Sequence, residues 1–140
     1  DRPFLWGSKR TGPDLMRVGN YRSTDWHDYH MKDPKSVVPG SIMPGYPWLY
    51  KNIADVETAY AEQLTIEHFF DVPYNKPIPM RDGSTETVAL ADSLAGAQAS
   101  ALAEAKAVAA DMKDQDVKDL VNQGKIPEIV ALIAYMNSLK

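Results

Sequence analysis

Residues 40–49 of the chain read Gly40-Ser41-Ile42-Met43-Pro44-Gly45-Tyr46-Pro47-Trp48-Leu49. Proline fixes its own φ angle and pushes the residue before it into an extended conformation. The loop therefore presents Met43 at a defined angle, with aromatic residues close behind it. A thioether is a soft, neutral ligand that suits haem iron and raises its reduction potential. The alternative is that Met43 fills a gap in the core, as most methionines do.

A second segment lies upstream and reads Trp6-Gly7-Ser8-Lys9-Arg10-Thr11-Gly12-Pro13-Asp14-Leu15. Taken alone, its last four residues indicate a turn. In order and spacing, however, the two segments together resemble c-type cytochromes. In that class a Gly-Pro-x-Leu turn follows the haem-attachment site, and its proline carbonyl accepts a hydrogen bond from the axial histidine. A later loop then supplies an axial methionine.

The resemblance narrows to one family, the mono-haem subunit (subunit II) of cbb3-type cytochrome c oxidase. It is densest over residues 4–49 and returns over residues 129–136, which are similar to the closing helix of that cytochrome domain. Residues 75–125 make a longer middle section than the family implies. The further motifs that carry the resemblance are Arg17-Val18-Gly19, Asp25-Trp26-His27, Asp33-Pro34, Val37-Val38-Pro39, Ser41-Ile42-Met43-Pro44 and Tyr46-Pro47-Trp48-Leu49.

The chain departs from the family pattern because it contains no cysteine. A c-type haem is attached through Cys-x-x-Cys-His, whose histidine is the proximal ligand. In the family, that motif and a membrane anchor lie upstream of the residues that begin this chain. We therefore expect a fragment of a mainly α, cytochrome c-like domain that lacks its N-terminal haem-attachment helix. Such a fragment would hold the distal half of a haem site.

The resemblance also implies a function. The family relays electrons from a di-haem subunit toward the catalytic subunit of a terminal oxidase, at the periplasmic side of the bacterial inner membrane. Met43 would be the distal axial ligand of a haem c, and Pro13 would orient the proximal histidine. Arg10 and Trp6 are candidates for the haem edge, where guanidinium groups suit the propionate carboxylates. Oxygen reduction would belong to the catalytic subunit, so we expect no catalytic residue in this chain.

A competing hypothesis is an interaction module that binds no haem and docks a partner through its helical region. The distribution of charge limits the kinds of partner that such a module could bind. Residues 1–53 carry a net charge of +3, and residues 54–140 carry a net charge of −7. The acidic larger part argues against a nucleic-acid surface and against adhesion to anionic lipid. No apolar run approaches the ~20 residues that a membrane span needs. Membrane contact would then come only through the family's anchor, which is absent from this chain.

We expect one domain over residues 1–140, with a loop-rich haem-facing segment over residues 1–53. A single short helix should interrupt that segment, capped by Ser23 or Thr24 and ended by Asp33-Pro34. Residues 54–140 are predicted to be mainly helical, with a long middle insertion. The expected elements there are a helix from Asp55 to about Phe70, a connector over residues 75–85, an alanine-rich helix from about Asp92 to Lys113, a short helix that Asp116 caps and Gly124 closes, and a last helix that begins at Pro127.

The last helix has a strongly apolar face, made by Ile129, Leu132, Ile133, Met136 and Leu139. A cytochrome c core packs its first helix against its last, so without the first helix we expect an exposed patch here. The alanine-rich helix could cover this patch, because Leu94, Ala97, Ala101, Ala105, Val108 and Met112 lie on one stripe of it. Otherwise a second copy of the chain would cover it, as a homodimer.

His27 and His30 allow a different chemistry. They stand three residues apart on the short predicted helix, so both could face one metal ion. No third ligand is evident in the sequence, and the alternative is that this helix serves in packing.

We predict that these 140 residues carry no covalent haem when produced in a host that attaches haem c. Thioether attachment needs cysteine thiols, and the chain has none. Intact-mass measurement checks this, with a Cys-x-x-Cys-His cytochrome from the same host as the control. A mass increase of one haem on this chain would contradict the prediction.

Overall fold

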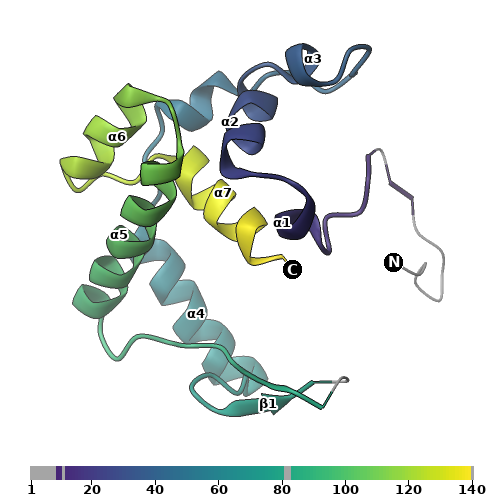
Figure 1. The fold of residues 1–140 in the computed structure, drawn as a ribbon. Helices are drawn as coiled ribbons and strands as arrows, with labels where there is room; N and C mark the ends of the chain where they lie inside the picture. The colour runs from purple at the N-terminus through teal and green to yellow at the C-terminus, as the bar shows by residue number, and fades with distance from the viewer. Residues whose placement is uncertain (1–8, 11, 81–82, 140) are drawn as a thin grey trace. The chain divides into compact units, whose positions relative to one another are not determined.

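A computed structural model describes residues 9–10, 12–80 and 83–139 of the chain. These residues form helices and one two-stranded sheet, so the expectation of a mainly α chain is confirmed (Figure 1). The elements are α1 (Val18–Tyr21), α2 (Thr24–Lys32), α3 (Pro34–Val37), the 3₁₀ helix η1 (Pro47–Tyr50), α4 (Val56–Phe70), β1 (Pro77–Pro79), β2 (Thr85–Thr87), α5 (Leu94–Asp111), α6 (Gln115–Asn122) and α7 (Glu128–Ser138).

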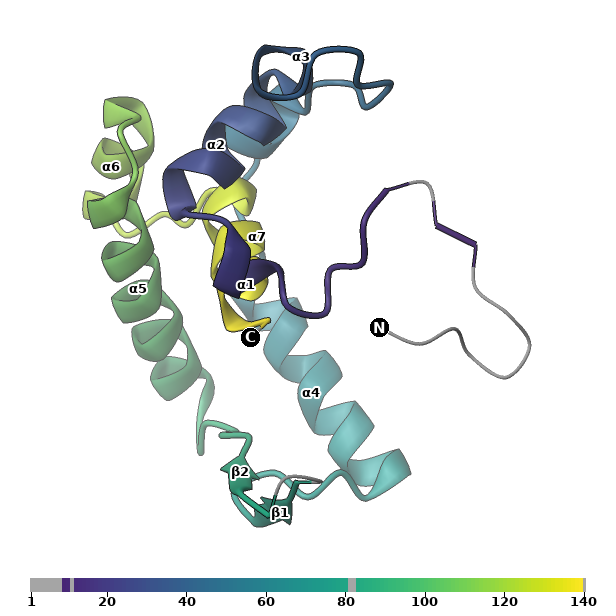
Figure 2. The same cartoon turned by 45° about the vertical axis from the view of Figure 1, so that its right-hand side comes forward.

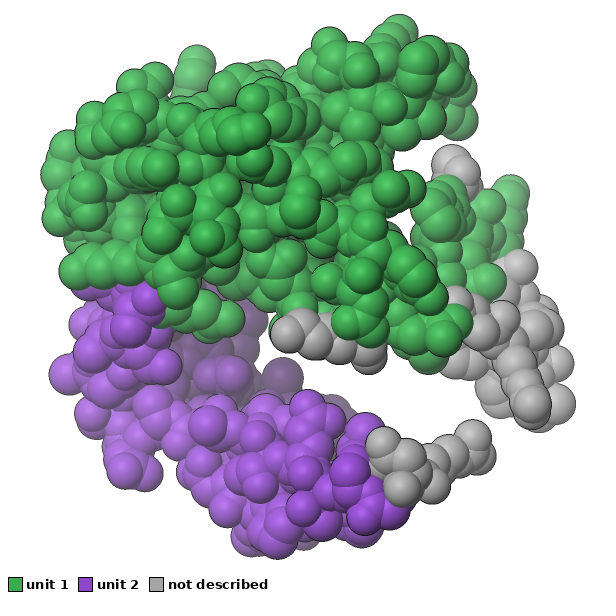
Figure 3. Space-filling view, viewed as in Figure 1, with its two compact units in different colours: residues 1–54, 104–140 green, residues 55–103 purple. Residues whose placement is uncertain are grey.

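The chain divides into two compact units. Unit 1 comprises residues 1–54 and 104–140, and unit 2 comprises residues 55–103 (Figure 3). Helix α5 contributes its first part to unit 2 and its last part to unit 1. Both segments that resemble a cytochrome therefore belong to unit 1, together with the last helix.

The core of unit 1 is built around α7. Ile129, Val130 and Ile133 are completely buried, and α7 contacts α1, α2 and η1 (Figure 2). The other buried apolar side chains of this unit come from the end of α5, from α6 and from the segments that join them to α7: Ala105, Val108, Ala109, Met112, Val117, Val121, Ile126 and Met136. The expected exposure of Ile129, Ile133 and Met136 is therefore wrong.

The reason is that unit 1 supplies its own cover for the face of α7. Short elements from residues 18–50 lie against α7, and the end of the alanine-rich helix contributes three of the buried side chains of the same unit. None of the six residues of the predicted alanine-rich stripe is exposed, and Ala105, Val108 and Met112 are buried. Burial within one chain removes the argument from which a homodimer was expected.

Helix α1 approaches the C-terminal end of α7 closely at one glycine. The Gly19 N–H donates to the carbonyl of Leu139 at 2.8 Å. A Cβ atom on Gly19 would stand only 2.6 Å from the carbonyl oxygen of Asn137 and 2.8 Å from that of Met136. Asn137 also donates to the Thr24 hydroxyl at 3.1 Å, at the start of α2. The end of α7 is thus tied to both α1 and α2.

Residues 1–53 contain more helix than predicted. Helix α2 is where the sequence places it, with the Ser23 hydroxyl accepting from the Trp26 N–H at 3.2 Å. Asp33 ends α2 but also caps α3, because its side chain accepts from the Lys35 N–H and Pro34 fits the first helical position. Pro34, which was predicted to end a helix, therefore also starts the next one, and Pro47 starts η1.

The predicted N-cap of α6 is wrong. Asp114, not Asp116, caps this helix, and its carboxylate accepts from the N–H groups of Asp116 and Val117. Gly124 follows the helix with a φ of +81°, a conformation that suits glycine at a helix C-terminus.

Unit 2 contains α4, a hairpin and the first part of α5. Asp55 caps α4 through the Thr58 N–H, and the helix ends at Phe70, as predicted. The predicted connector contains a short antiparallel hairpin in which Ile78 pairs with Glu86. Its strands are only three residues long, and prolines interrupt their alternation, so no strand pattern stands out in the sequence.

Within the described residues, no helix combines the length and the apolarity that crossing a bilayer requires.

We predict that Gly19→Ala destabilises the chain, while Gly12→Ala does not. The added methyl group of the first variant would meet backbone carbonyl oxygens, which cannot rotate away, and overpacking of this kind costs about 1–3 kcal/mol. A methyl group at Gly12 meets nothing within 4 Å. Urea unfolding of both variants measures the difference, and equal midpoints would contradict the close approach of α1 to α7.

Candidate functional site

The Met43 loop, residues 41–46, runs between α3 and η1. Met43 is partly buried, and its N–H donates to the Ser41 hydroxyl at 3.2 Å. The loop starts from a turn in which the Ser41 N–H donates to the carbonyl of Val38. Both of these bonds are local, so they shape the loop but do not place it on the rest of the unit.

The end of the loop is held against the C-terminal half of α2. The Tyr46 N–H donates to the carbonyl of Met31 at 2.9 Å. At Gly45, a Cβ atom would come within 2.7 Å of the Lys32 carbonyl oxygen, so only glycine allows the loop to lie this close to α2. Sequence reasoning missed this role of Gly45, although its place between Pro44 and Tyr46 marks a special backbone position.

A buried polar pair fixes the helical turn that follows the loop. The Tyr50 hydroxyl lies 2.6 Å from Asp28 Oδ1 and 2.8 Å from the Asp28 carbonyl oxygen, although Asp28 is only 3 % exposed. Burial raises the pKa of the Asp28 carboxyl, while the Tyr50 hydroxyl and the Lys32 ammonium act in the opposite sense. Burial and the bond to Asp28 also raise the pKa of the Tyr50 phenol, which therefore remains a donor.

Two ion pairs join α2 to the junction between α5 and α6. Lys32 Nζ lies 2.7 Å from Asp114 Oδ2, and Lys113 Nζ lies 2.9 Å from Asp25 Oδ2. The bond to Lys32 lowers the pKa of Asp114, the same carboxylate that caps α6. Partners more than 80 residues apart leave no local signal, so the sequence could not predict these pairs.

The predicted proximal turn lies in the segment that leads into α1. Pro13 is exposed, and Arg10 forms an ion pair with Asp14 at 2.8 Å. Asp14 also accepts from the Met16 N–H at 2.9 Å, which closes the turn. Within the described residues, no hydrogen bond or ion pair links Pro13 or Arg10 to Met43. Trp6 lies outside the described residues.

The two segments share one property, which is exposed apolar surface. The exposed fractions are 52 % for Leu15 and 62 % for Met16 after the Pro13 turn, and 86 % for Ile42 and 49 % for Trp48 around Met43. Trp48 contacts the Tyr46 ring edge-on at 5.2 Å between centroids. In the same unit, Ile129, Val130, Ile133 and Met136 of α7 are buried, while Tyr21 and Tyr135 are also exposed. Exposed apolar side chains therefore occur on both segments, though not on them alone.

A partly buried thioether on a pinned loop, with apolar side chains left open beside it, fits a large flat apolar group with a soft metal centre. Comparison with protein families then decides the identity of the chain. A model described as "Cytochrome C oxidase, mono-heme subunit/FixO" matches residues 1–140. The chain belongs to this family. A comparison with individual curated proteins finds no match.

Membership of the cytochrome c oxidase mono-heme subunit family confirms the resemblance read from the sequence. It makes the chain a member of an oxidase subunit family that carries one haem. Since the chain has no cysteine, covalent attachment of that haem would need residues other than these 140. Met43 offers a partly buried thioether, which is a soft donor, whereas Met16 after the Pro13 turn is 62 % exposed.

The histidines of α2 differ in their surroundings. His27 is 1 % exposed, and neither of its ring nitrogens has a hydrogen-bond partner among the described residues. His30 stacks on the Trp26 ring, which also meets the His27 ring edge-on at 5.4 Å between centroids and lies 4.5 Å from the Arg22 guanidinium. Over the described part of the chain, no group of three or more histidine or carboxylate side chains could hold a metal ion.

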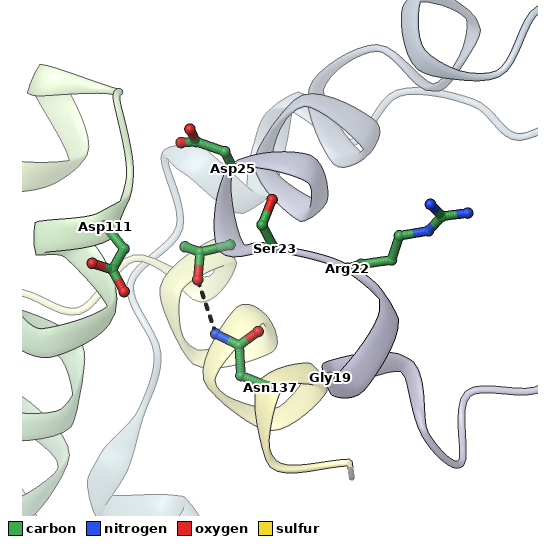
Figure 4. Close-up of a pocket in the computed structure, with 7 residues that line it drawn as sticks. Gly19, Arg22, Ser23, Asp25, Asp111 and Asn137 are labelled. Atoms are coloured by element: carbon green, nitrogen blue, oxygen red, sulfur yellow. Dashed lines mark hydrogen bonds between the residues drawn. The ribbon is translucent and has the colours of Figure 1, made fainter.

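A polar pocket of about 440 Å³ opens beside the start of α2 (Figure 4). It is lined by Gly19, Arg22, Ser23, Thr24, Asp25, Asp111 and Asn137. The lining holds one cationic and two acidic side chains, and Arg22 extends away from Asp25 and Asp111 in Figure 4, so the charged groups do not converge on one point. No residue of the Met43 loop lines it, and it is separate from the candidate site.

We predict that stability falls as pH drops below about 6.5, and that His27→Gln weakens this dependence. Burial, together with the nearby His30 and Arg22, lowers the pKa of His27 from 6.5 in the folded chain. Between the two pKa values the unfolded chain binds more protons, so stability rises with pH through that range and is lost below it.

Urea unfolding at pH 7.5 and pH 5.5 measures the effect. The matched control is His68→Gln, which removes an exposed histidine from α4. If the His27 and His68 variants keep the same pH dependence as the unchanged chain, a buried neutral His27 is not its cause.

Proposed function

We propose that the chain is part of the electron-transfer subunit of a cbb3-type terminal cytochrome c oxidase. It would relay electrons through a haem c from the di-haem subunit to the catalytic subunit, at the periplasmic side of the bacterial inner membrane. The family match supports the oxidase subunit, and the two cytochrome-like segments support the electron-transfer role.

The observation that carries the proposal is the setting of Met43. Its thioether lies on a loop that Gly45 and Tyr46 hold against α2, and exposed apolar side chains border the loop. A core methionine needs neither an anchored loop nor an open apolar surface beside it. Both features are expected where a ligand to haem iron is held at a fixed place.

Several residues of unit 1 would contribute to haem binding in different ways. Met43 supplies a neutral sulfur that favours the reduced state of the iron. Leu15, Ile42 and Trp48 cover apolar surface and exclude water. Pro13 offers its carbonyl to the proximal histidine. When bound, the haem supplies the one-electron redox chemistry, which no side chain of this chain provides.

Arg10 and Trp6 remain candidates for the haem edge. Arg10 is already paired with Asp14 at 2.8 Å, so binding a propionate would require it to share or exchange that carboxylate. Arginine can do so because its guanidinium carries five N–H donors.

The competing hypothesis, an interaction module without haem, draws support from unit 2. Helix α4 buries none of its side chains, and Phe69 and Phe70 are about three-quarters exposed. Large exposed aromatic groups are typical of protein interfaces. A Soret band and a pyridine haemochrome on the longer, cysteine-containing protein would support electron transfer, and their absence would support the interaction module.

We predict that Met43→Ala in the haem-loaded subunit abolishes the sulfur-to-iron charge-transfer band and lowers the reduction potential. Loss of a soft axial ligand removes stabilisation of the ferrous state. Absorbance spectroscopy and a redox titration measure both effects. The control is Met16→Ala, which removes an exposed methionine from the segment after Pro13. An unchanged band in the Met43 variant would show that another residue ligates the iron.

A further inference from the structure

The segment after Met43 is fixed to one short part of α2. Tyr46 bonds to the carbonyl of Met31 at 2.9 Å, Gly45 lies against the carbonyl of Lys32, and Tyr50 bonds to Asp28. These three contacts join residues 45–50 to residues 28–32 of α2. Of these contacts, only the bond between Tyr50 and Asp28 joins two side chains.

The surroundings of Asp28 favour the bond between the two side chains. A buried carboxyl group is costly unless it is hydrogen-bonded, and the Tyr50 hydroxyl, 2.6 Å from Oδ1, meets that requirement at Asp28. Lys32 Nζ lies 5.3 Å from the centroid of the Tyr50 ring, and its own position is fixed by Asp114 at 2.7 Å. The ring and the hydroxyl of Tyr50 are therefore both held in place.

We propose that Asp28 and Tyr50 are positioning residues that hold the Met43 loop on α2 and so keep the Met43 sulfur in place for haem iron. The inference rests on the proposed function of Met43. Because Tyr50 follows Met43 by only seven residues, loss of the Tyr50 bond would leave the loop held to α2 by backbone contacts alone. The loop would then leave α2 more often, and the sulfur would be lost from the iron more often.

The first test measures how well Met43 competes with an added ligand. In the haem-loaded subunit, Tyr50→Phe keeps the ring but removes the hydroxyl, and we expect ferric haem to bind imidazole about tenfold more tightly. A hydrogen bond to a charged group has a net value large enough for such a change. The matched control is Tyr60→Phe, which removes the hydroxyl bond from Tyr60 to the carbonyl of Ala91 in unit 2.

Two variants of Asp28 test whether the hydrogen bond to Tyr50 is the cause of the effect. Asp28→Asn keeps a carbonyl oxygen that can accept from Tyr50, so its imidazole affinity should stay near that of the unchanged protein. Asp28→Leu removes the side-chain acceptor and keeps only the backbone carbonyl of residue 28, so it should shift imidazole affinity in the same direction as Tyr50→Phe. In the double variant of Asp28→Leu and Tyr50→Phe the effects should not add, because both remove the same bond.

A second test needs no assumption about the iron ligand. Hydrogen exchange of the backbone amides over residues 41–50 reports how often the loop leaves α2. We expect Tyr50→Phe to speed exchange at Tyr46, whose amide donates to Met31, and Tyr60→Phe to leave it unchanged.

The outcomes distinguish the two proposals. Faster exchange together with tighter imidazole binding supports positioning of the Met43 sulfur. Unchanged exchange at Tyr46 in the Tyr50 variant overturns the positioning role, whatever the iron ligand is. Faster exchange with unchanged imidazole affinity also overturns it, because the loop would then move without any effect on the haem. An unchanged charge-transfer band in Met43→Ala would instead refute the proposed ligand.

Discussion

The hydrogen bond between the Tyr50 hydroxyl and the Asp28 carboxyl is the contact on which the arrangement of unit 1 depends most. It joins η1, which follows the Met43 loop, to the middle of α2. Lys32, at the end of α2, lies near the Tyr50 ring and pairs with Asp114, which caps α6. A buried carboxyl group tolerates few alternative arrangements, because leaving it without a donor costs more than the bond itself stabilises. The polar pair therefore fixes which part of α2 faces the loop.

Around this pair the unit is closed by α7. Its apolar face, formed by Ile129, Ile133 and their neighbours, is covered by short elements from residues 18–50, and the end of α5 supplies further buried side chains to the same unit. The close approach at Gly19 shows how little space separates α1 from the end of α7. A cytochrome c-like domain is usually described through its first and last helices packed together. Here the buried face of α7 contacts α1, α2 and η1 of the same unit.

Some of the exposed apolar residues lie on the segments that carry the family resemblance. Leu15, Ile42 and Trp48 lie on the two segments that resemble a cytochrome, and the family to which the chain belongs carries one haem. Exposure of large apolar side chains is unfavourable in water, so surfaces of this kind are normally covered by a ligand or a partner. In the proposed function, a haem would cover these side chains, whereas Ile129, Val130, Ile133 and Met136 of α7 are buried within the chain itself.

The sequence by itself determined the local structure, because caps and turns are decided by neighbouring residues. Ser23 and Asp55 begin their helices as predicted, and the alanine-rich stripe turns inward. The motifs around Pro13 and Met43 were also enough to identify the family. Only the tertiary structure decided which residues hold the site together. Pairs such as Asp28 with Tyr50, or Lys32 with Asp114, join residues far apart in the chain, and no local pattern selects one distant partner over another. For the same reason the sequence predicted an exposed face on α7, since its cover comes from α1, α2 and η1, which are distant in the chain.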